Sequence, residues 1–213
     1  MRIALSLLLG SLVSACGGSE PLPENQGPMS FFITSRNLGG GDLGGLAGAD
    51  ALCQTLAKES GSTLTEWRAY LSATSDTGPV HAKDRIGNGP WFNVKGVLVA
   101  TDLANLHGDD NKLGAATSLT EKGESLGRLH DILTGSNPDG TYAGADATCE
   151  DWTSRSTSDM AMLGHYDKRG GGIRPRSWNS AHLSQGCSLP SLEATAGDAR
   201  FYCFAVLSST PAN

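Results

Sequence analysis

The stretch LAGADALCQTLAKESG, from Leu46 to Gly61, decides how the rest of the chain is interpreted. Apolar residues recur in it at helical spacing: Leu46, Ala49, Leu52, Cys53 and Leu56. This spacing predicts an amphipathic helix of about three turns, and Gly61 is typical of a helix stop. Cys53 belongs to the apolar set, so we expect it to be buried.

Part of this stretch is nearly repeated further along the chain. AGADALC, Ala47–Cys53, returns as AGADATC, Ala143–Cys149. QTLAKE follows the first copy and is helical in pattern, whereas EDWTSRST follows the second and is rich in β-formers. The flanks share no pattern, so a duplicated unit is not predicted. We expect Gly-Ala-Asp to supply a backbone turn ahead of a buried cysteine in each copy.

The remaining pattern predicts short strands separated by glycine, asparagine and proline. The strand candidates are SFFITS (Ser30–Ser35), WRAYLS (Trp67–Ser72), PWFNVKGVLVAT (Pro90–Thr101), HDILTG (His130–Gly135), CEDWTS (Cys149–Ser154), MAMLGH (Met160–His165) and RFYCFAVL (Arg200–Leu207). Between Asp102 and Glu124 the chain is polar and irregular. One early helix followed by many short strands and long loops predicts an α+β domain.

The N-terminal segment has the pattern of an export signal. A positive start and the apolar run Ile3–Leu9 lead into Val13-Ser14-Ala15-Cys16. Such a run is too short to span a membrane and predicts a secretory signal over 1–15. Val-Ser-Ala-Cys resembles the bacterial lipobox, which implies cleavage before Cys16 and lipid on that cysteine. The alternative is a chance cysteine after an ordinary signal.

A linker separates Cys16 from the predicted domain. GGSEPLPENQGP, 17–28, is rich in glycine, proline and polar residues and predicts a flexible tether over 16–29. Gly17 is not aspartate, and by resemblance to Gram-negative lipoproteins this favours the outer membrane. We therefore expect one domain over 30–213, held to the membrane through lipid and located in the cell envelope or on the cell surface.

Charge and cysteine usage exclude some classes of function. The formal net charge is −6, which argues against nucleic acid as a partner. Without Cys16, four cysteines remain, and an even number in an exported chain predicts disulfides with three possible pairings. They are Cys53, Cys149, Cys187 and Cys203. None shows C-x-x-C spacing, so neither a zinc site nor a redox motif is predicted.

Several segments together resemble the endostatin-like branch of the C-type lectin fold, including related domains of bacterial lipoproteins. They are LGGLAGADALCQTLA with WRAYLS, AKDRI before PWFN, TGSNPDGTYAGADATCEDWTS, SWNSAHLSQGC and ARFYCFA. The resemblance covers Ser30 to Leu207 and is weakest from Asp102 to Glu124. It implies one or two helices on short antiparallel strands with long loops. It also implies nested disulfides, with Cys53 paired to Cys203 and Cys149 to Cys187.

The resemblance also suggests a calcium and sugar site. C-type lectins bind both through a proline-containing triplet and a Trp-Asn-Asp triplet. Asn137-Pro138-Asp139 is similar to the first triplet, and Trp178-Asn179-Ser180 is similar to the second. Calcium needs six to eight oxygen ligands. The candidate ligands are Asn137, Asp139, Asp146 and Asn179. Because Ser180 replaces an acid, too few carboxylates converge for us to expect a metal or another cofactor here.

A basic, glycine-rich stretch is the second candidate site. DKRGGGIRPRSW, Asp167–Trp178, concentrates positive charge in an acidic chain. The basic residues are Lys168, Arg169, Arg174 and Arg176. We expect this loop to meet the turn Asn137–Gly140, with Trp178 stacking on a sugar and charged groups fixing its hydroxyls. The alternative is a solvent-exposed loop without a role in recognition.

Catalytic patterns are weak. GESLG, Gly123–Gly127, matches G-x-S-x-G, but the segment before Ser125 is polar where a nucleophile elbow needs a buried strand. The five histidines have no ligand spacing, and we expect surface or hydrogen-bonded roles: His81, His107, His130, His165 and His182. The sequence favours a non-catalytic lectin-like binding lipoprotein for a glycan or an extracellular protein. The alternatives are a structural envelope protein, a calcium-dependent carbohydrate binder and a hydrolase.

The lipobox interpretation predicts that Cys16→Ser releases the protein from the membrane fraction. Without the thiol there is no site for the acyl chains that hold the protein to the bilayer. Fractionation of cells that express each form measures this directly. A Cys16→Ser variant that stays in the membrane fraction would show that the anchor is elsewhere.

Overall fold

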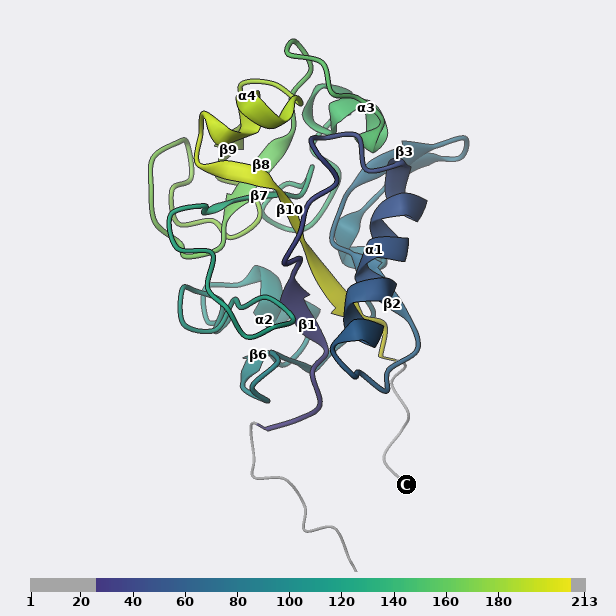
Figure 1. Ribbon diagram of the computed structural model, residues 1–213, viewed down its shortest axis with the longest axis vertical. Helices are drawn as coiled ribbons and strands as arrows, with labels where there is room; N and C mark the ends of the chain where they lie inside the picture. Colours follow the sequence, from purple (N-terminus) through teal and green to yellow (C-terminus); the bar gives the residue numbers. More distant parts are fainter. Residues whose placement is uncertain (1–25, 208–213) are drawn as a thin grey trace, which may run out of the picture.

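The computed structural model describes residues 26–207 (Figure 1). The expected signal peptide 1–15, Cys16 and the tether up to residue 25 lie outside the described residues. Within 26–207, no helix has both the length and the apolar composition needed to cross a membrane. The domain is α+β, as expected, with few helices and short strands.

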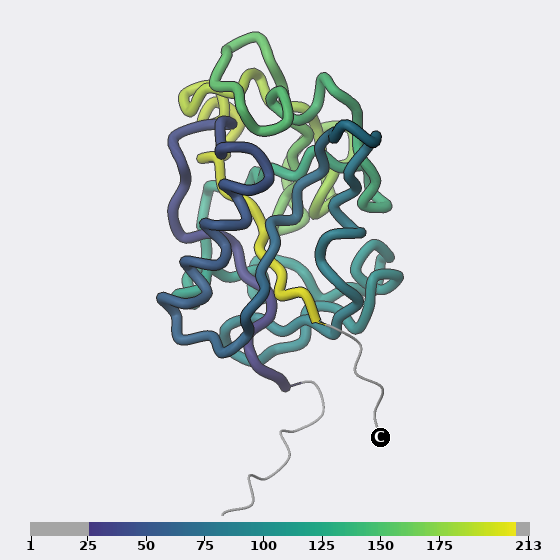
Figure 2. Tube along the Cα trace, turned by 90° about the vertical axis from the view of Figure 1, so that its right-hand side faces the viewer, coloured from purple at the N-terminus to yellow at the C-terminus, as the bar shows by residue number. Residues whose placement is uncertain are grey.

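Strand β10 (Gly197–Ala205) is the centre of the main sheet. Strand β1 (Phe31–Ile33) runs antiparallel along one of its edges. The other edge is shared by β2 (Trp67–Ala69), antiparallel to its C-terminal half, and by β7 (Asp131–Leu133), parallel to its N-terminal half. Strands β8 (Met162–His165) and β9 (His182–Leu183) continue the sheet beyond β7. Figure 2 shows this yellow strand running down the middle of the molecule.

The two faces of β10 belong to two hydrophobic cores, because side chains alternate along a strand. Phe201 and Cys203 face a core that includes helix α1 (Gly45–Glu59) and two tryptophans. Tyr202 and Phe204 face the opposite core, which is mainly aromatic. Its largest members are Phe31, Tyr70, Trp91, Tyr166, Trp178, Tyr202 and Phe204. The strand is therefore buried on both sides.

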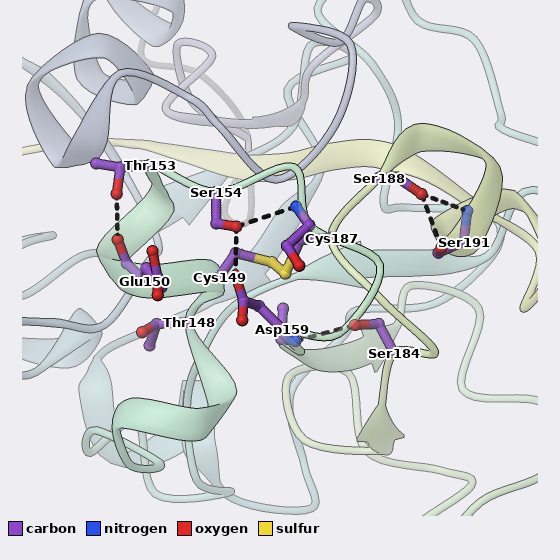
Figure 3. The surroundings of a disulfide bond; sticks show 12 residues. Thr148, Cys149, Glu150, Thr153, Ser154, Asp159, Ser184, Cys187, Ser188 and Ser191 are labelled. Atoms are coloured by element: carbon purple, nitrogen blue, oxygen red, sulfur yellow. Dashed lines mark hydrogen bonds between the residues drawn. A yellow bond between two sulfur atoms is a disulfide. The ribbon is translucent and has the colours of Figure 1, made fainter.

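Two disulfides lie in the core that contains α1. Cys53–Cys203 connects α1 to β10, with Cα atoms 5.5 Å apart. Cys149–Cys187, with Cα atoms 5.7 Å apart, joins the short helix α3 (Cys149–Trp152) to the segment that enters α4 (Leu189–Glu193), as Figure 3 shows. The second bond lies inside the loop that the first one closes. This nested pairing is the one that the resemblance implies.

The remaining elements are short and lie between these. They are the hairpin β3 (Ala73–Ser75) and β4 (Gly78–Val80), the 3-10 turns η1 (Ala82–Asp84) and η2 (Ala145–Ala147), the pair β5 (Trp91–Phe92) and β6 (Leu98–Ala100), and helix α2 (Leu103–His107). The expected strands SFFITS, WRAYLS, HDILTG and MAMLGH contain β1, β2, β7 and β8. RFYCFAVL overlaps β10, which begins earlier, at Gly197. PWFNVKGVLVAT contains β5 and β6.

Two local expectations are wrong. CEDWTS forms the turn of α3 rather than a strand, with Glu150 and Asp151 at φ +52°. Thr148 caps this turn by accepting a hydrogen bond from Asp151 N, and Trp152 is buried, so these contacts override the β propensity of the segment. The first Gly-Ala-Asp lies inside α1 rather than in a turn. There Asp50 has a different role.

Asp50 connects α1 to β2 and to η1. Its carboxylate accepts hydrogen bonds from Ala69 N at 2.8 Å, from Arg68 at 3.0 Å and from Arg85 at 2.8 and 2.7 Å. Arg85 also donates to the carbonyls of Ala69 and Leu71. Burial lowers the pKa of Arg85 although Asp50 opposes that shift. Arg85 Nη2 contacts both carboxylate oxygens, and this ion pair compensates a charge that is otherwise costly to bury.

We expect Asp50→Ala to reduce the free energy of unfolding by about 3–5 kcal/mol, because it leaves Arg85 buried without a counter-charge. Urea titration followed by circular dichroism measures the loss. Glu59→Ala is the matched control on the same helix, since Glu59 pairs with Arg36 at the exposed surface, and it should cost less than about 1 kcal/mol. Equal effects for the two variants would contradict this assignment.

Candidate functional site

The turn after β7 and the loop after β8 meet at a cavity of about 580 Å³. Three segments contribute: the end of α2, the turn at Pro138 and the loop Asp167–Trp178, which we call the basic loop. The lining residues are His107, Gly108, Asp109, Asn111, Pro138, Lys168, Arg174, Pro175, Arg176, Ser177, Trp178 and Asn179. The structure thus places the two segments singled out by the sequence at one cavity.

The turn Asn137–Gly140 packs closely against the His107 side chain. Gly140 N donates to the Asn137 carbonyl at 2.9 Å, and Gly140 has φ +79°. A Cβ at Gly140 would lie 2.4 Å from His107 Nε2, so only glycine fits. Asp139 is exposed, and two hydrogen bonds from Thr141 lower the pKa of its carboxyl. The turn therefore presents a fixed carboxylate beside the cavity.

A buried hydrogen-bond chain holds the turn against the sheet. Asn179 Nδ2 donates to Tyr70 Oη at 2.9 Å and to the carbonyls of Asn137 and Pro138 at 3.0 and 3.2 Å. Tyr70 Oη lies 2.7 Å from His107 Nε2, and His107 Nδ1 lies 2.9 Å from the Leu103 carbonyl. A carbonyl only accepts, so His107 donates from Nδ1 and Tyr70 donates to Nε2. Burial also lowers the pKa of His107.

Trp178 does not have the expected role. Its side chain is 4% exposed, and its Nε1 donates to the Leu106 carbonyl at 3.1 Å. The indole packs on Tyr70 with ring centroids 4.7 Å apart. A buried indole gains both apolar contact and a partner for its N–H, which explains why it turns inward. The expectation that this ring stacks on a sugar is therefore wrong.

The basic residues divide into anchored and free side chains. Lys168 Nζ donates to Asn111 Oδ1 at 2.7 Å, and Arg174 donates to the Ser180 carbonyl at 3.3 Å. Burial lowers the pKa of Lys168, and the nearby charge of Arg176 lowers it further. Arg176 is exposed at the cavity. Arg169 is exposed too, but it does not line the cavity.

The four calcium candidates do not share one site. Asp146 lines a second cavity of about 340 Å³, whose acidic residues also include Glu150, Asp151 and Asp159. Asn179 lines the first cavity, where its Oδ1 accepts a hydrogen bond from Ser177 Oγ at 3.0 Å. Asp146 lies within η2 (Ala145–Ala147) and not in the turn at Asn137, which explains this separation.

A cluster of histidines around a buried carboxylate was not expected. His130, Asp131, His165 and His182 converge at the end of β7, β8 and β9, and we call them the histidine–aspartate cluster. His165 is fully buried and its Nδ1 is hydrogen-bonded to the Pro175 carbonyl, so of the two expected roles it has the hydrogen-bonded one. Strand pairing sets Asp131 opposite His165. Aligning HDIL and MLGH as antiparallel neighbouring strands would have placed Asp131 opposite His165 and so revealed this cluster.

The G-x-S-x-G motif lies in a loop between α2 and β7, without a strand before it or a helix after it in the described chain. Ser125 Oγ lies 3.0 Å from Tyr166 Oη. This is not the geometry of a nucleophile elbow. No protein-family model matches the chain, and no curated protein matches it either. The cavity and the cluster are therefore interpreted from their own geometry.

We expect Tyr70→Phe to cost about 1–3 kcal/mol of stability, because the change leaves His107 Nε2 without a donor in a buried site. Thermal unfolding followed by circular dichroism checks this. Tyr142→Phe is the matched control, since the Tyr142 hydroxyl is buried without a hydrogen-bond partner, and its loss should be close to neutral. A neutral Tyr70→Phe would contradict the role given to the hydrogen-bond chain.

Proposed function

We propose that this chain is a non-catalytic, surface-anchored lipoprotein whose lectin-like domain binds an anionic glycan, free or carried on a protein, at the cavity beside the basic loop. One observation carries the proposal. Lys168, Arg174 and Arg176 line one cavity in a chain whose formal net charge is −6. Positive charge concentrated against the overall balance favours an anionic ligand.

The architecture supports a C-type-lectin-like, endostatin-like fold. One long helix, short strands around a central β10, long loops and two nested disulfides are features in common with that fold. Such scaffolds carry recognition on loops held by a rigid sheet. The turn Asn137–Gly140 and the basic loop are held in this way. Because one scaffold hosts unrelated activities, the ligand class is inferred from the cavity rather than from the fold.

The chemistry of the cavity favours carboxylate or sulfate groups over neutral sugars. Guanidinium groups form paired hydrogen bonds with such planar or tetrahedral anions. With Trp178 buried, stacking contributes little, so charge has to supply most of the affinity. We therefore expect weak, salt-sensitive binding. Asn137 and Asn179 use their amide N–H groups in internal hydrogen bonds. The exposed carboxylate of Asp139 is therefore the group of this edge that orients hydroxyl groups, without a bound calcium ion.

The sequence and the disulfides together support the proposed location. Two disulfides indicate an oxidising compartment. The first described residues emerge at the opposite end of the molecule from α3 and α4 (Figure 1). Lipid on Cys16 would thus hold the domain in the cell envelope, at the outer membrane or the cell surface. The end that carries α3 and α4 would then point away from the membrane.

The runner-up is a structural envelope lipoprotein that binds a protein and no small ligand. Ile173, between the glycines and the arginines of the basic loop, is 82% exposed. An apolar side chain beside arginines is common at protein interfaces. On this alternative the loop tip, rather than the cavity, makes the contact.

Binding of heparin-derived oligosaccharide, polyuronate and neutral dextran to the purified full chain tests the proposal. We expect the two anionic glycans to bind and dextran not to, with affinity falling as salt rises. Arg174→Ala and Arg176→Ala should each weaken binding about five- to tenfold, or about 1–1.4 kcal/mol. Arg36→Ala is the control, since Arg36 is paired with Glu59 on α1.

Two results would contradict the proposal. One is binding of neither anionic glycan by a chain with intact disulfides. The other is binding that Arg176→Ala leaves unchanged. If Ile173→Ser alone abolishes capture of an envelope protein, the structural alternative holds instead.

A further inference from the structure

Asp131 is a buried carboxylate without a hydrogen-bond donor. Its side chain is 0% exposed, and neither oxygen accepts a hydrogen bond. Three imidazole nitrogens surround Oδ1: His165 Nε2 at 3.3 Å, His130 Nε2 at 3.5 Å and His182 Nε2 at 3.5 Å. A buried carboxylate without a hydrogen-bond donor is costly, so it needs a positively charged partner.

The backbone fixes the tautomers of two of these histidines. His165 Nδ1 lies 2.9 Å from the Pro175 carbonyl, and His182 Nδ1 lies 2.9 Å from the Leu183 carbonyl. Because carbonyls only accept, both rings carry hydrogen on Nδ1 and, when neutral, a lone pair on Nε2. In the neutral form of both rings, two lone pairs thus face the Asp131 carboxylate. Metal-binding histidines commonly donate their second nitrogen to a backbone carbonyl in this way.

The distances fit metal ligands better than hydrogen bonds. An N–H···O bond is about 2.7–3.2 Å long, and the three distances here exceed that. Zinc bound tetrahedrally at about 2.0–2.2 Å separates its ligand atoms by about 3.3–3.6 Å. The ligand atoms of His130, Asp131 and His165 also lie within 4.8 Å of one another. We propose that the histidine–aspartate cluster binds a divalent transition-metal ion of the zinc class.

The four residues have unequal parts in this site. Asp131 and His165 are fully buried and form its centre. The His182 ring lies at 61° to the His165 ring, so both can direct Nε2 to one ion after small movements. The His130 ring is stacked on His165 at 7°, and parallel rings cannot share an in-plane ion. His130, which is 21% exposed, has to turn to become the fourth ligand, or else water takes that position.

The basic loop covers this cluster. A Cβ at Gly170 would lie 2.7 Å from His130 Cε1 and 2.9 Å from His165 Cε1. A Cβ at Gly172 would lie 2.9 Å from His182 Cδ2. Pro175, in the same loop, accepts the hydrogen bond from His165. An ion in the cluster would therefore fix the loop that carries Arg174 and Arg176, although binding of the ion itself requires no ligand in the cavity.

Calorimetric titration of the chelator-treated full chain with Zn²⁺ tests the proposal. We expect one saturable site per chain, and visible absorption typical of tetrahedral Co²⁺ when cobalt replaces zinc. Ca²⁺ and Mg²⁺ should not compete, because they prefer oxygen ligands. His165→Ala and His182→Ala should each weaken Zn²⁺ binding at least tenfold, and His130→Ala should weaken it less.

His81→Ala is the control, because His81 accepts a hydrogen bond from Tyr142 N outside the cluster, and it should bind Zn²⁺ normally. If the buried His165→Ala variant does not fold, the partly exposed His182 decides the test. Absence of a saturable site in the folded chain would overturn the proposal. So would a site that His182→Ala leaves unchanged.

Discussion

Burial of β10 on both faces is the constraint on which the rest of the structure depends. Cys203 on one face is bonded to Cys53, so α1 cannot leave the sheet. Tyr202 on the other face donates through its hydroxyl to the Trp178 carbonyl at 2.9 Å. The N-terminal half of the strand pairs with β7 and places Asp131. One strand thus positions the floor of the cavity and the centre of the histidine–aspartate cluster.

The basic loop is where these two features meet. Its glycines pack on the imidazoles, which side chains at Gly170 and Gly172 would prevent. Its arginines lie at the cavity, and Trp178 at its end is buried in the aromatic core. A glycine-rich loop is normally costly to order, because glycine loses the most conformational freedom. Contacts at both ends, and an ion beneath it, would offset that cost.

Local pattern predicts the helix and most strands, because apolar spacing alone sets them. The disulfide pairing depended on resemblance rather than on local pattern. Long-range packing turns the Trp178 ring into the core and places Asp146 at the second cavity. Neither burial nor chain direction is a local property of the sequence. His165 and Asp131 lie 34 residues apart in sequence yet face each other across β7 and β8. Only strand register brings such residues together.

Amide chemical-shift mapping of the isotope-labelled full chain, titrated with heparin-derived oligosaccharide, tests most directly whether the basic loop is the recognition element. The account predicts the largest shifts at Asn111, Lys168, Arg176 and Ser177, with the core of β10 unchanged. Shifts gathered at the second cavity, around Asp146 and Asp151, would contradict it and place recognition at α3 instead.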